Sequence, residues 1–143
     1  CYEPWRIFRK PLSPGMKVSD CLREFQTGGL RRNPDGLPFC DVIRSERTPK
    51  KEREIAGHPS LKPQSLLRQL VWAVLPLGEG VILDPFMGSG STVAAAEAMG
   101  IPCIGVERSA EYYALSKNAV PRLANLAVPG MSYDETLFSA ASR

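Results

Sequence analysis

The chain has 143 residues, of which 43% are hydrophobic and 23% charged, and its formal net charge is +3. These proportions are typical of a globular protein with one buried core, and no apolar run approaches the ~20 residues that cross a bilayer, so we expect a cytoplasmic protein without a membrane segment. The four cysteines form no Cys-x-x-Cys pair and His58 is the only histidine, which argues against a zinc site and against a Ser-His triad.

The positive charge is concentrated in the first part of the chain. Residues 1–57 carry 12 Lys and Arg against 8 Asp and Glu, whereas residues 58–143 carry 6 against 7. A basic segment favours a polyanionic partner, and a solvated charged loop explains the same numbers equally well.

This basic segment is expected to be rich in loops. Pro-Gly, Gly-Gly and Asn-Pro-Asp-Gly steps punctuate it throughout. We expect a strand at residues 2–9, a short helix at 18–26 with Leu22 and Phe25 as its apolar contacts, and a short strand at 39–43. Residues 44–54 are highly charged without apolar periodicity, so they are expected to be exposed.

The second part of the chain has a more regular pattern. It predicts, in order, a helix from Pro63 to Pro76, a strand at 79–84 buried on both faces, a helix at 92–99, a second buried strand at 102–107, and a helix after Ser109 that kinks or restarts at Pro121. Gly100 is placed to end the middle helix. Strand, helix and strand in this order form a βαβ unit, which implies a parallel sheet.

The loop inside this unit has the composition of a ligand-binding turn. Gly88 and Gly90 let the backbone approach a ligand, and Ser89, Ser91 and Thr92 add hydroxyl groups. A phosphate loop requires Lys after the second glycine, and the dinucleotide motif requires a third glycine where Val93 stands. Both patterns are therefore absent.

Two carboxylates narrow the ligand further. Asp84 precedes the loop and would repel a pyrophosphate while attracting an amine or a cation. Glu107 ends the second strand, where a carboxylate can accept both hydroxyl groups of a ribose. An adenosine with a ribose, an amino group and no phosphate fits these demands, and S-adenosylmethionine is such a molecule. The alternative is a glycine turn that only packs the βα unit.

Two motifs resemble a known family. The stretch "DPFMGSGST" at residues 84–92 resembles the cofactor motif Asp-Pro-Phe-x-Gly-Ser-Gly-Thr of DNA methyltransferases that make N6-methyladenine or N4-methylcytosine. Ser91 replaces the usual threonine and keeps the hydroxyl. Upstream, "HPSLKP" at residues 58–63 is similar to the His-Pro-Thr-x-Lys-Pro element of the same family, with Ser60 in place of threonine.

The resemblance implies a partial Rossmann-like α/β fold that binds S-adenosylmethionine, a parallel βαβ core with a loop-rich insertion. The residues expected at the cofactor are Asp84, Pro85, Phe86, Met87, Gly88, Ser89, Gly90, Ser91, Thr92, Glu107, Arg108, His58, Ser60 and Lys62. In the family, the His-Pro-Thr element lies beside the methionine part of the cofactor. No metal is expected.

The order of the motifs is similar to that of the permuted subgroup often labelled β, whose target-recognition region lies between the catalytic half and the cofactor half. This implies four parts: residues 1–10 as a strand of the catalytic half, 11–57 as the target-recognition segment, 58–128 as the cofactor-binding region, and 129–143 as a tail. The partners implied are double-stranded DNA and S-adenosylmethionine, with a homodimer as an open option.

One element of the family is absent from the sequence. Its catalytic tetrapeptide, Asp, Ser or Asn followed by Pro-Pro and an aromatic residue, holds the target amine and stacks on a flipped base. No Pro-Pro occurs here. We therefore expect no catalytic residue in this chain, which starts at Cys1 within a suspected strand, and we expect the tetrapeptide upstream in a missing N-terminal half. A non-catalytic binding fragment and an RNA methyltransferase remain the alternatives.

For DNA contacts we favour Arg31 and Arg32, because Gly28 and Gly29 would let the backbone approach a phosphate. Further candidates are Arg44, Arg47, Lys50, Lys51 and Arg53, whose contacts would give salt-dependent binding. The alternative is that neighbouring glutamates neutralise these cations in a solvated loop. The two tryptophans, Trp5 and Trp72, are expected in the core.

Overall fold

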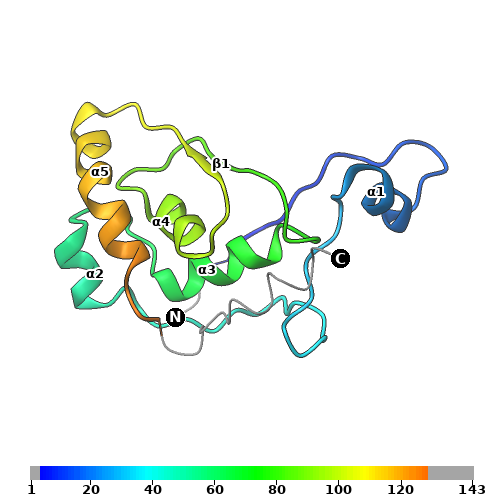
Figure 1. The fold of residues 1–143 in the computed structure, drawn as a ribbon, viewed down its shortest axis with the longest axis horizontal. Helices are drawn as coiled ribbons and strands as arrows, with labels where there is room; N and C mark the ends of the chain where they lie inside the picture. The colour runs from blue at the N-terminus through cyan, green and yellow to red at the C-terminus, as the bar shows by residue number, and fades with distance from the viewer. Residues whose placement is uncertain (1–3, 129–143) are drawn as a thin grey trace.

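The computed structural model describes residues 4–128, and the expected tail at 129–143 and the first residues of the expected strand at 2–9 lie outside them. Five helices and two strands follow one another in the described residues: α1 (Val18–Phe25), α2 (Lys50–Ile55), α3 (Gln64–Ala73), β1 (Ile82–Asp84), α4 (Ser91–Ala98), β2 (Cys103–Gly105) and α5 (Ala110–Ala124). Figure 1 shows α2 to α5 gathered on one side and α1 at the end of an arm. None of the helices in this range is long and apolar enough to span a membrane.

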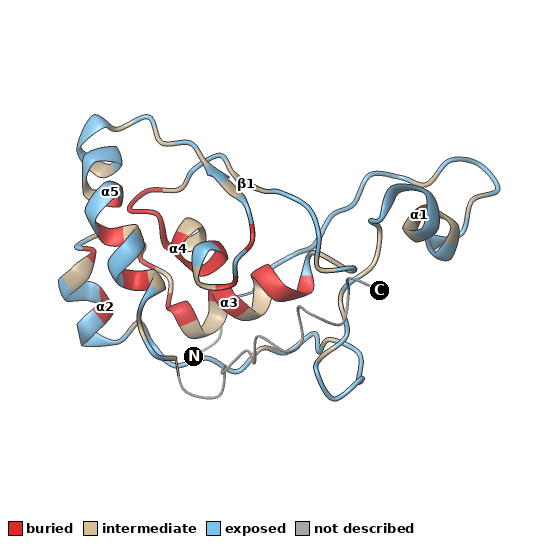
Figure 2. Ribbon diagram, in the orientation of Figure 1, coloured by how far each residue is buried: buried red, intermediate tan, exposed pale blue. Residues whose placement is uncertain are grey.

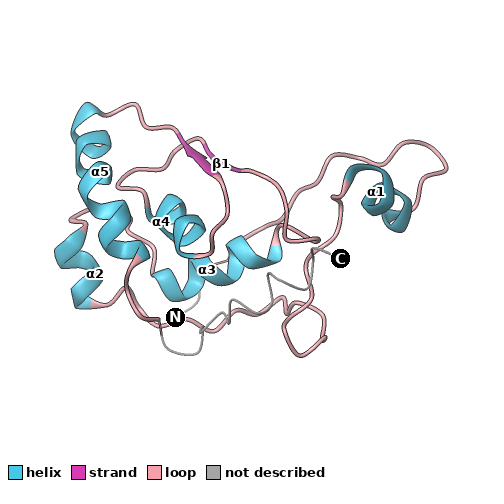
Figure 3. Ribbon diagram, in the orientation of Figure 1, coloured by secondary structure: helices cyan, strands magenta, loops and turns pink. Residues whose placement is uncertain are grey.

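The two strands form the predicted βαβ unit around α4. They pair in parallel, with Ile82 opposite Cys103 and Asp84 opposite Gly105, and α4 connects them (Figure 3). The predicted α/β class with a parallel core is therefore confirmed. The strands are shorter than expected, three residues each.

Helix α4 forms because its sequence, STVAAAEA, is rich in the strongest helix former. At its end Gly100 adopts φ +65°, and the N–H of Ile101 donates to the carbonyl of Ala96. This left-handed end satisfies carbonyls that the helix leaves unpaired, as the sequence predicted for Gly100.

Helix α5 begins after the predicted cap, Ser109, and continues past Pro121, where a kink or restart was predicted. The hydroxyl of Ser109 accepts the N–H of Tyr112 at 3.4 Å. Pro121 lies inside the helix, which continues to Ala124 without restarting. A proline inside a helix removes one hydrogen bond and crowds the carbonyl four residues earlier, and the buried side chain of Leu123 offsets this by packing the last turn against the core.

Two apolar clusters form the core on the two sides of α4. One joins α3 to α4 and its flanking strands, and the other joins α4 to α5 and to the segment between α2 and α3. Ala94, Ala95 and Ala96 are fully buried, so their small side chains let α3 and α5 approach α4 closely. The buried segments in Figure 2 follow this arrangement.

The sheet is covered on one face only, which corrects the prediction of strands buried on both faces. Ile82 and Cys103 pack on the first core cluster. The residues that alternate with them are 51–62% exposed and form a surface that we call the open face: Val81, Leu83, Ile104 and Val106. Parallel sheets normally have both faces covered, but the described residues supply one layer of helices.

Four predictions for residues 4–43 are wrong: the two strands, the burial of Trp5 and the packing of Phe25. No strand forms over residues 4–9 or 39–43, because strands need partners and only β1 and β2 pair here. Trp5, expected in the core, is 37% exposed. Helix α1 occurs as predicted, but Phe25 is 56% exposed and Cys21 is its buried residue.

Residues 44–54 were expected to be exposed throughout, but they contain α2, and Glu52 is only 5% exposed. Helix α2 packs against α5. The sequence did not predict this contact, because the residue of α2 that is buried is the acidic Glu52 and the segment has no repeated apolar residues.

Arg31 and Arg32 connect the basic segment to α3. The Arg31 guanidinium stacks on the Trp72 ring at 3.5 Å, and its backbone N–H donates to the carbonyl of Ala73 at 2.8 Å. The Trp72 indole N–H donates to the carbonyl of Arg32 at 3.1 Å. Trp72 is buried, as predicted.

Candidate cofactor site

The glycine loop lies at the carboxyl ends of the two paired strands. The Asp84 carboxylate accepts the N–H of Phe86 at 3.0 Å, which closes a tight turn directly after β1. The N–H of Met87 donates to the carbonyl of Val106 at 3.0 Å and ties the loop to the residue after β2. In open α/β sheets, ligands bind beyond this edge.

Both glycines of the loop adopt positive φ angles that favour glycine. Gly90 has φ +87°, and a Cβ atom there would lie 2.5 Å from the side chain of Val120 in α5. Gly88 has φ +56°, and a Cβ there would lie 3.1 Å from Nε2 of His58. The loop is therefore packed between α5 and the His58 element, and these positions exclude larger residues.

Glu107 is held by the same loop. Its two carboxylate oxygens accept N–H groups from Ser109 at 2.7 Å and from Gly88 at 3.0 Å. The hydrogen bond from Ser109, followed by those from Gly88 and Arg108 and by the nearby charge of His58, lowers the pKa of this carboxyl despite some desolvation. A carboxylate offers about four acceptor positions, so an ionised and oriented Glu107 can still accept further donors.

His58 lies between the loop and α5. Its ring packs edge-on against Tyr112, with 4.4 Å between ring centroids, and its Nδ1 accepts the N–H of Ser60 at 3.1 Å. Since the same ring borders Gly88, the structure brings the two motifs together.

The other expected cofactor residues differ in exposure. Ser89 and Ser91 are buried, and the Ser89 hydroxyl has no hydrogen-bond partner within the described residues. Thr92, Met87 and Lys62 are half-buried. Those that are exposed are Pro85, Phe86, Ser60 and Arg108.

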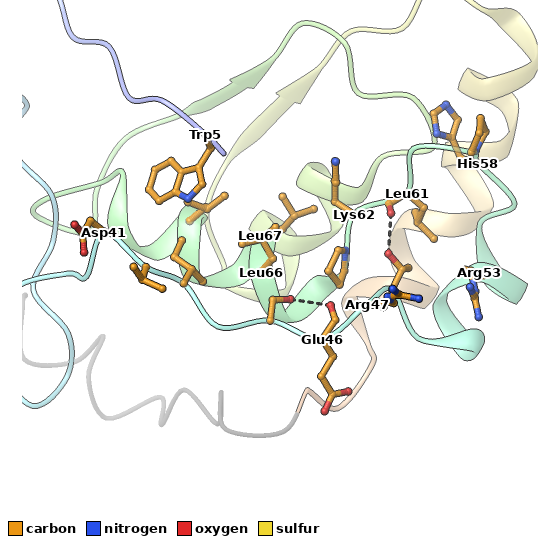
Figure 4. A pocket seen from close by; sticks show the side chains of 17 residues that line it. Trp5, Asp41, Glu46, Arg47, Arg53, His58, Leu61, Lys62, Leu66 and Leu67 are labelled. Atoms are coloured by element: carbon orange, nitrogen blue, oxygen red, sulfur yellow. Dashed lines mark hydrogen bonds between the residues drawn. The ribbon is translucent and has the colours of Figure 1, made fainter. Parts of the chain in front are cut away.

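A cavity of about 820 Å³ lies beside the His58 element (Figure 4). Trp5 lies at one end of it and His58 at the other, while leucines of α3 form part of its wall. Of the expected cofactor residues, only His58 and Lys62 line this cavity. It therefore borders the His58 element and not the glycine loop.

The expected DNA-contacting residues lie in two places. Arg44, Arg47, Lys50, Lys51 and Arg53 are exposed on and before α2. Arg31 and Arg32 lie at the other end of α3, where Arg32 is exposed and donates to the carbonyl of Gly36 at 2.8 Å. The Arg31 guanidinium faces Trp72 instead of open solvent. No group of three potential metal ligands occurs in residues 4–128.

Comparison with known proteins decides the family. A family model described as DNA methylase, of the N6/N4 class, matches residues 5–118. The chain belongs to this DNA methylase family. The structure shows the corresponding α/β core, reduced to two strands.

Two curated relatives of this chain are type II methyltransferases: M2.DpnII of Streptococcus pneumoniae, 36% identical over 83 residues, and M2.LlaDCHI of Lactococcus lactis subsp. cremoris, 35% identical over 83 residues. The match covers 58% of this chain and 31% and 30% of the relatives. The chain thus spans about a third of the length of these relatives.

Solved structures give weaker likenesses. M1.HpyAVI in complex with SAM aligns with a TM-score of 0.47 at 23% identity, over 66% of this chain and 44% of that one. TTHA0409, a putative DNA modification methylase of Thermus thermophilus complexed with S-adenosyl-L-methionine, aligns with a TM-score of 0.40 at 26% identity, over 69% and 44% of the chains.

The sequence did not indicate three buried polar residues behind the glycine loop. Gln64 is fully buried, and Glu52 and Arg68 are 5% and 6% exposed. Gln64 directly follows the "HPSLKP" motif, so its position was the one available signal. Glu52 and Arg68 are charged residues that belong to no motif, and nothing in the sequence distinguishes them from surface residues.

Proposed function

We propose that the chain is the cofactor-binding and target-recognition part of a DNA methyltransferase that transfers the methyl group of S-adenosylmethionine to an exocyclic amine of adenine or cytosine. Residues 58–128 would bind the cofactor, and residues 11–57 would contact double-stranded DNA in the cytoplasm. The chemistry of the transfer would require a catalytic tetrapeptide from a further portion of the methylase, because the sequence contains no Pro-Pro step.

The arrangement of Glu107 carries the cofactor proposal. Two backbone N–H groups orient its carboxylate and lower its pKa, and acceptor positions remain for a ribose diol. Asp84 lies at the end of the adjacent strand, in register with Gly105, and would face the amine or the sulfonium charge. The solved relatives named as SAM complexes support the same ligand.

Calorimetric titration with S-adenosylhomocysteine tests this site. We expect saturable binding by the chain, and a loss of at least about tenfold in affinity in Glu107→Ala, since a charged hydrogen bond contributes about 1.5 to 3 kcal/mol. Glu111→Ala, an exposed glutamate in the first turn of α5, is the matched control. Equal affinity in wild type and Glu107→Ala would contradict the assignment of Glu107.

The catalytic part of the proposal has its own assay. The chain is incubated with DNA and with S-adenosylmethionine labelled on its methyl group. We expect no label in the DNA, and turnover by the chain alone would refute the requirement for a further catalytic portion.

The exposed cations on and before α2 are the proposed DNA contacts. Lys50 pairs with Glu54 at 3.6 Å, but both side chains are well exposed, so this pair is worth little and leaves Lys50 available. Fluorescence anisotropy with a labelled duplex should show affinity that falls with salt. The double variant Lys50→Ala, Lys51→Ala should flatten the slope of log K against log salt by about 1 to 2, and an unchanged slope would remove these two lysines from the interface.

A further inference from the structure

A chain of hydrogen bonds connects the basic segment to the glycine loop through the core. The first link is at α3, whose N-cap residue Pro63 has no side-chain acceptor for the unpaired N–H groups of the first turn. The Glu52 carboxylate of α2 supplies this acceptor: it receives the backbone N–H of Gln64 at 3.0 Å in a buried position. Glu52 therefore caps α3 from a neighbouring helix.

The second link is the side chain of Gln64, which leaves the first turn of α3 in a fully buried position. Its Nε2 donates to the backbone carbonyl of Ser91 at 2.9 Å. Its Oε1 has no hydrogen-bond partner in the described residues. Reversing the amide would place Oε1 against the Ser91 carbonyl, two acceptors facing each other, so this single bond fixes the orientation of the amide.

Ser91 is the residue that joins the glycine loop to α4. It follows Gly90 directly, and its carbonyl lies in the first turn of the helix whose free N–H groups face the loop. A donor that holds this carbonyl from the core side fixes the start of α4 and leaves those N–H groups free for a ligand. Neither motif contains Gln64, yet it connects the end of "HPSLKP" to the end of "DPFMGSGS".

We propose that Gln64 is a positioning residue for the glycine loop, held in place by Glu52 of the basic segment. The inference rests on the proposed function only for the identity of the ligand that the loop binds. The positioning itself is a property of the unliganded chain, so it can be measured without the cofactor.

Hydrogen exchange of the unliganded full chain tests the proposal, with Gln64→Met as the variant of similar size. The reporter is the amide of Ala94, which donates to the carbonyl of Gly90 at 2.9 Å. We expect its exchange to accelerate about fivefold to tenfold, the effect of losing one buried hydrogen bond. The amide of Tyr113 in α5, bonded to Ser109 at 2.9 Å, should keep its rate.

Gln69→Met is the matched control, because Gln69 lies on the same helix and its amide also donates to a backbone carbonyl, that of Ser65 at 2.6 Å. It should leave the Ala94 rate unchanged. The proposal is overturned if Gln64→Met leaves the Ala94 rate at its wild-type value, or if the Ala94 and Tyr113 rates rise equally, which would indicate general loosening.

A pair of Glu52 variants decides the matter if Gln64→Met yields too little folded protein. Glu52→Gln keeps an oxygen that can accept the Gln64 N–H and should preserve the slow Ala94 exchange, whereas Glu52→Leu removes the acceptor and should accelerate it. Equal Ala94 rates in these two variants would overturn the role of Glu52.

Affinity for S-adenosylhomocysteine completes the test. Gln64→Met should bind about fivefold more weakly than Gln69→Met, which should bind like wild type. If wild type binds no S-adenosylhomocysteine, the proposed function fails, while the exchange rates still decide whether Gln64 positions the loop.

Discussion

Different interactions stabilise residues 4–49 and residues 50–128. Among the buried apolar residues of the described chain, only Cys21 lies before residue 50, and the rest lie in α3, α4, α5 and the loops next to the helices and strands after residue 50. In the first region large apolar side chains are exposed without a core beneath them, with Phe8 at 84% and Val42 at 72%. Apolar burial therefore stabilises residues 50–128, whereas residues 4–49 depend on a few attachments, chiefly Arg31 on Trp72.

This contrast predicts where substitutions will be costly. Changes in the packed region should alter the free energy of unfolding strongly, and changes in the basic segment should alter it weakly.

Gly90→Ala should have the largest effect. The substitution places a side chain at φ +87° and puts its Cβ 2.5 Å from Val120. Backbone strain and overpacking together should cost about 3 kcal/mol in the free energy of unfolding, measured by urea denaturation. Gly36→Ala is the control, since it has φ +80° with nothing within 4 Å and so separates strain from packing. Equal losses in both variants would show that α5 does not pack on the loop.

Arg68→Met should come second. The Arg68 guanidinium is buried and donates to three carbonyls at the end of α5, those of Leu123, Ala124 and Leu126, at 3.0 to 3.2 Å. Methionine fills the space but removes the Arg68 donor from all three carbonyls, of which that of Leu123 keeps the backbone N–H of Leu126, and this should cost roughly 2 kcal/mol in chemical denaturation. Arg122→Met, an exposed arginine in the last turn of α5, should change stability little.

Arg31→Met should have a smaller effect on global stability. It removes the stacking of the guanidinium on Trp72 and should cost about 1 kcal/mol. Because Arg31 attaches residues 4–49 to α3, the rate of limited proteolysis before residue 50 should rise in Arg31→Met by a larger factor than the rate of global unfolding. Arg44→Met, an exposed arginine of the same segment, should leave proteolysis unchanged, and the same rate in both variants would show that Arg31 is no attachment.

The pH dependence of Glu107 should give the smallest effect. Its folded pKa lies below the ordinary value of 4.5, chiefly because of the N–H of Ser109. Its stabilisation is therefore present above the unfolded pKa and is lost as the pH falls through the folded pKa. The difference in Tm between wild type and Glu107→Gln should be largest at about pH 6 and should shrink toward about pH 3. A difference independent of pH would mean that the charge of Glu107 contributes nothing.

The sequence predicted those elements that are determined locally. The glycine loop, the alanine-rich α4 and the caps at Gly100 and Ser109 occur where local composition placed them. The run of apolar residues at 81–83 could not reveal that one face is open, since buried and uncovered strands can have the same composition. The strand expected at 2–9 is not observed over residues 4–9, because strand pairing depends on residues far away in the chain.

The motifs predicted some residues of the site, but they did not predict the residues that support it. Gly88, His58 and Glu107 belong to motifs, and the structure brings them together. The supporting contacts of Gln64 and Glu52 cross 27 and 12 residues of sequence and involve no repeated pattern, so only coordinates reveal them. Arg31 was favoured for DNA because Gly28 and Gly29 precede it, and its actual neighbour Trp72 lies 41 positions further along the chain, so the local sequence could not reveal this contact.

The open face of the sheet has a calorimetric consequence. The heat capacity change of unfolding arises mainly from apolar surface that becomes hydrated as the chain unfolds. Val81, Leu83, Ile104 and Val106 are already about half hydrated in the folded chain, so each adds less to it than a buried residue would. The open face should therefore lower the heat capacity change slightly and make the stability curve somewhat flatter than that of the same chain with the face covered. Any layer that covers this face would make the curve steeper, even if Tm itself did not move.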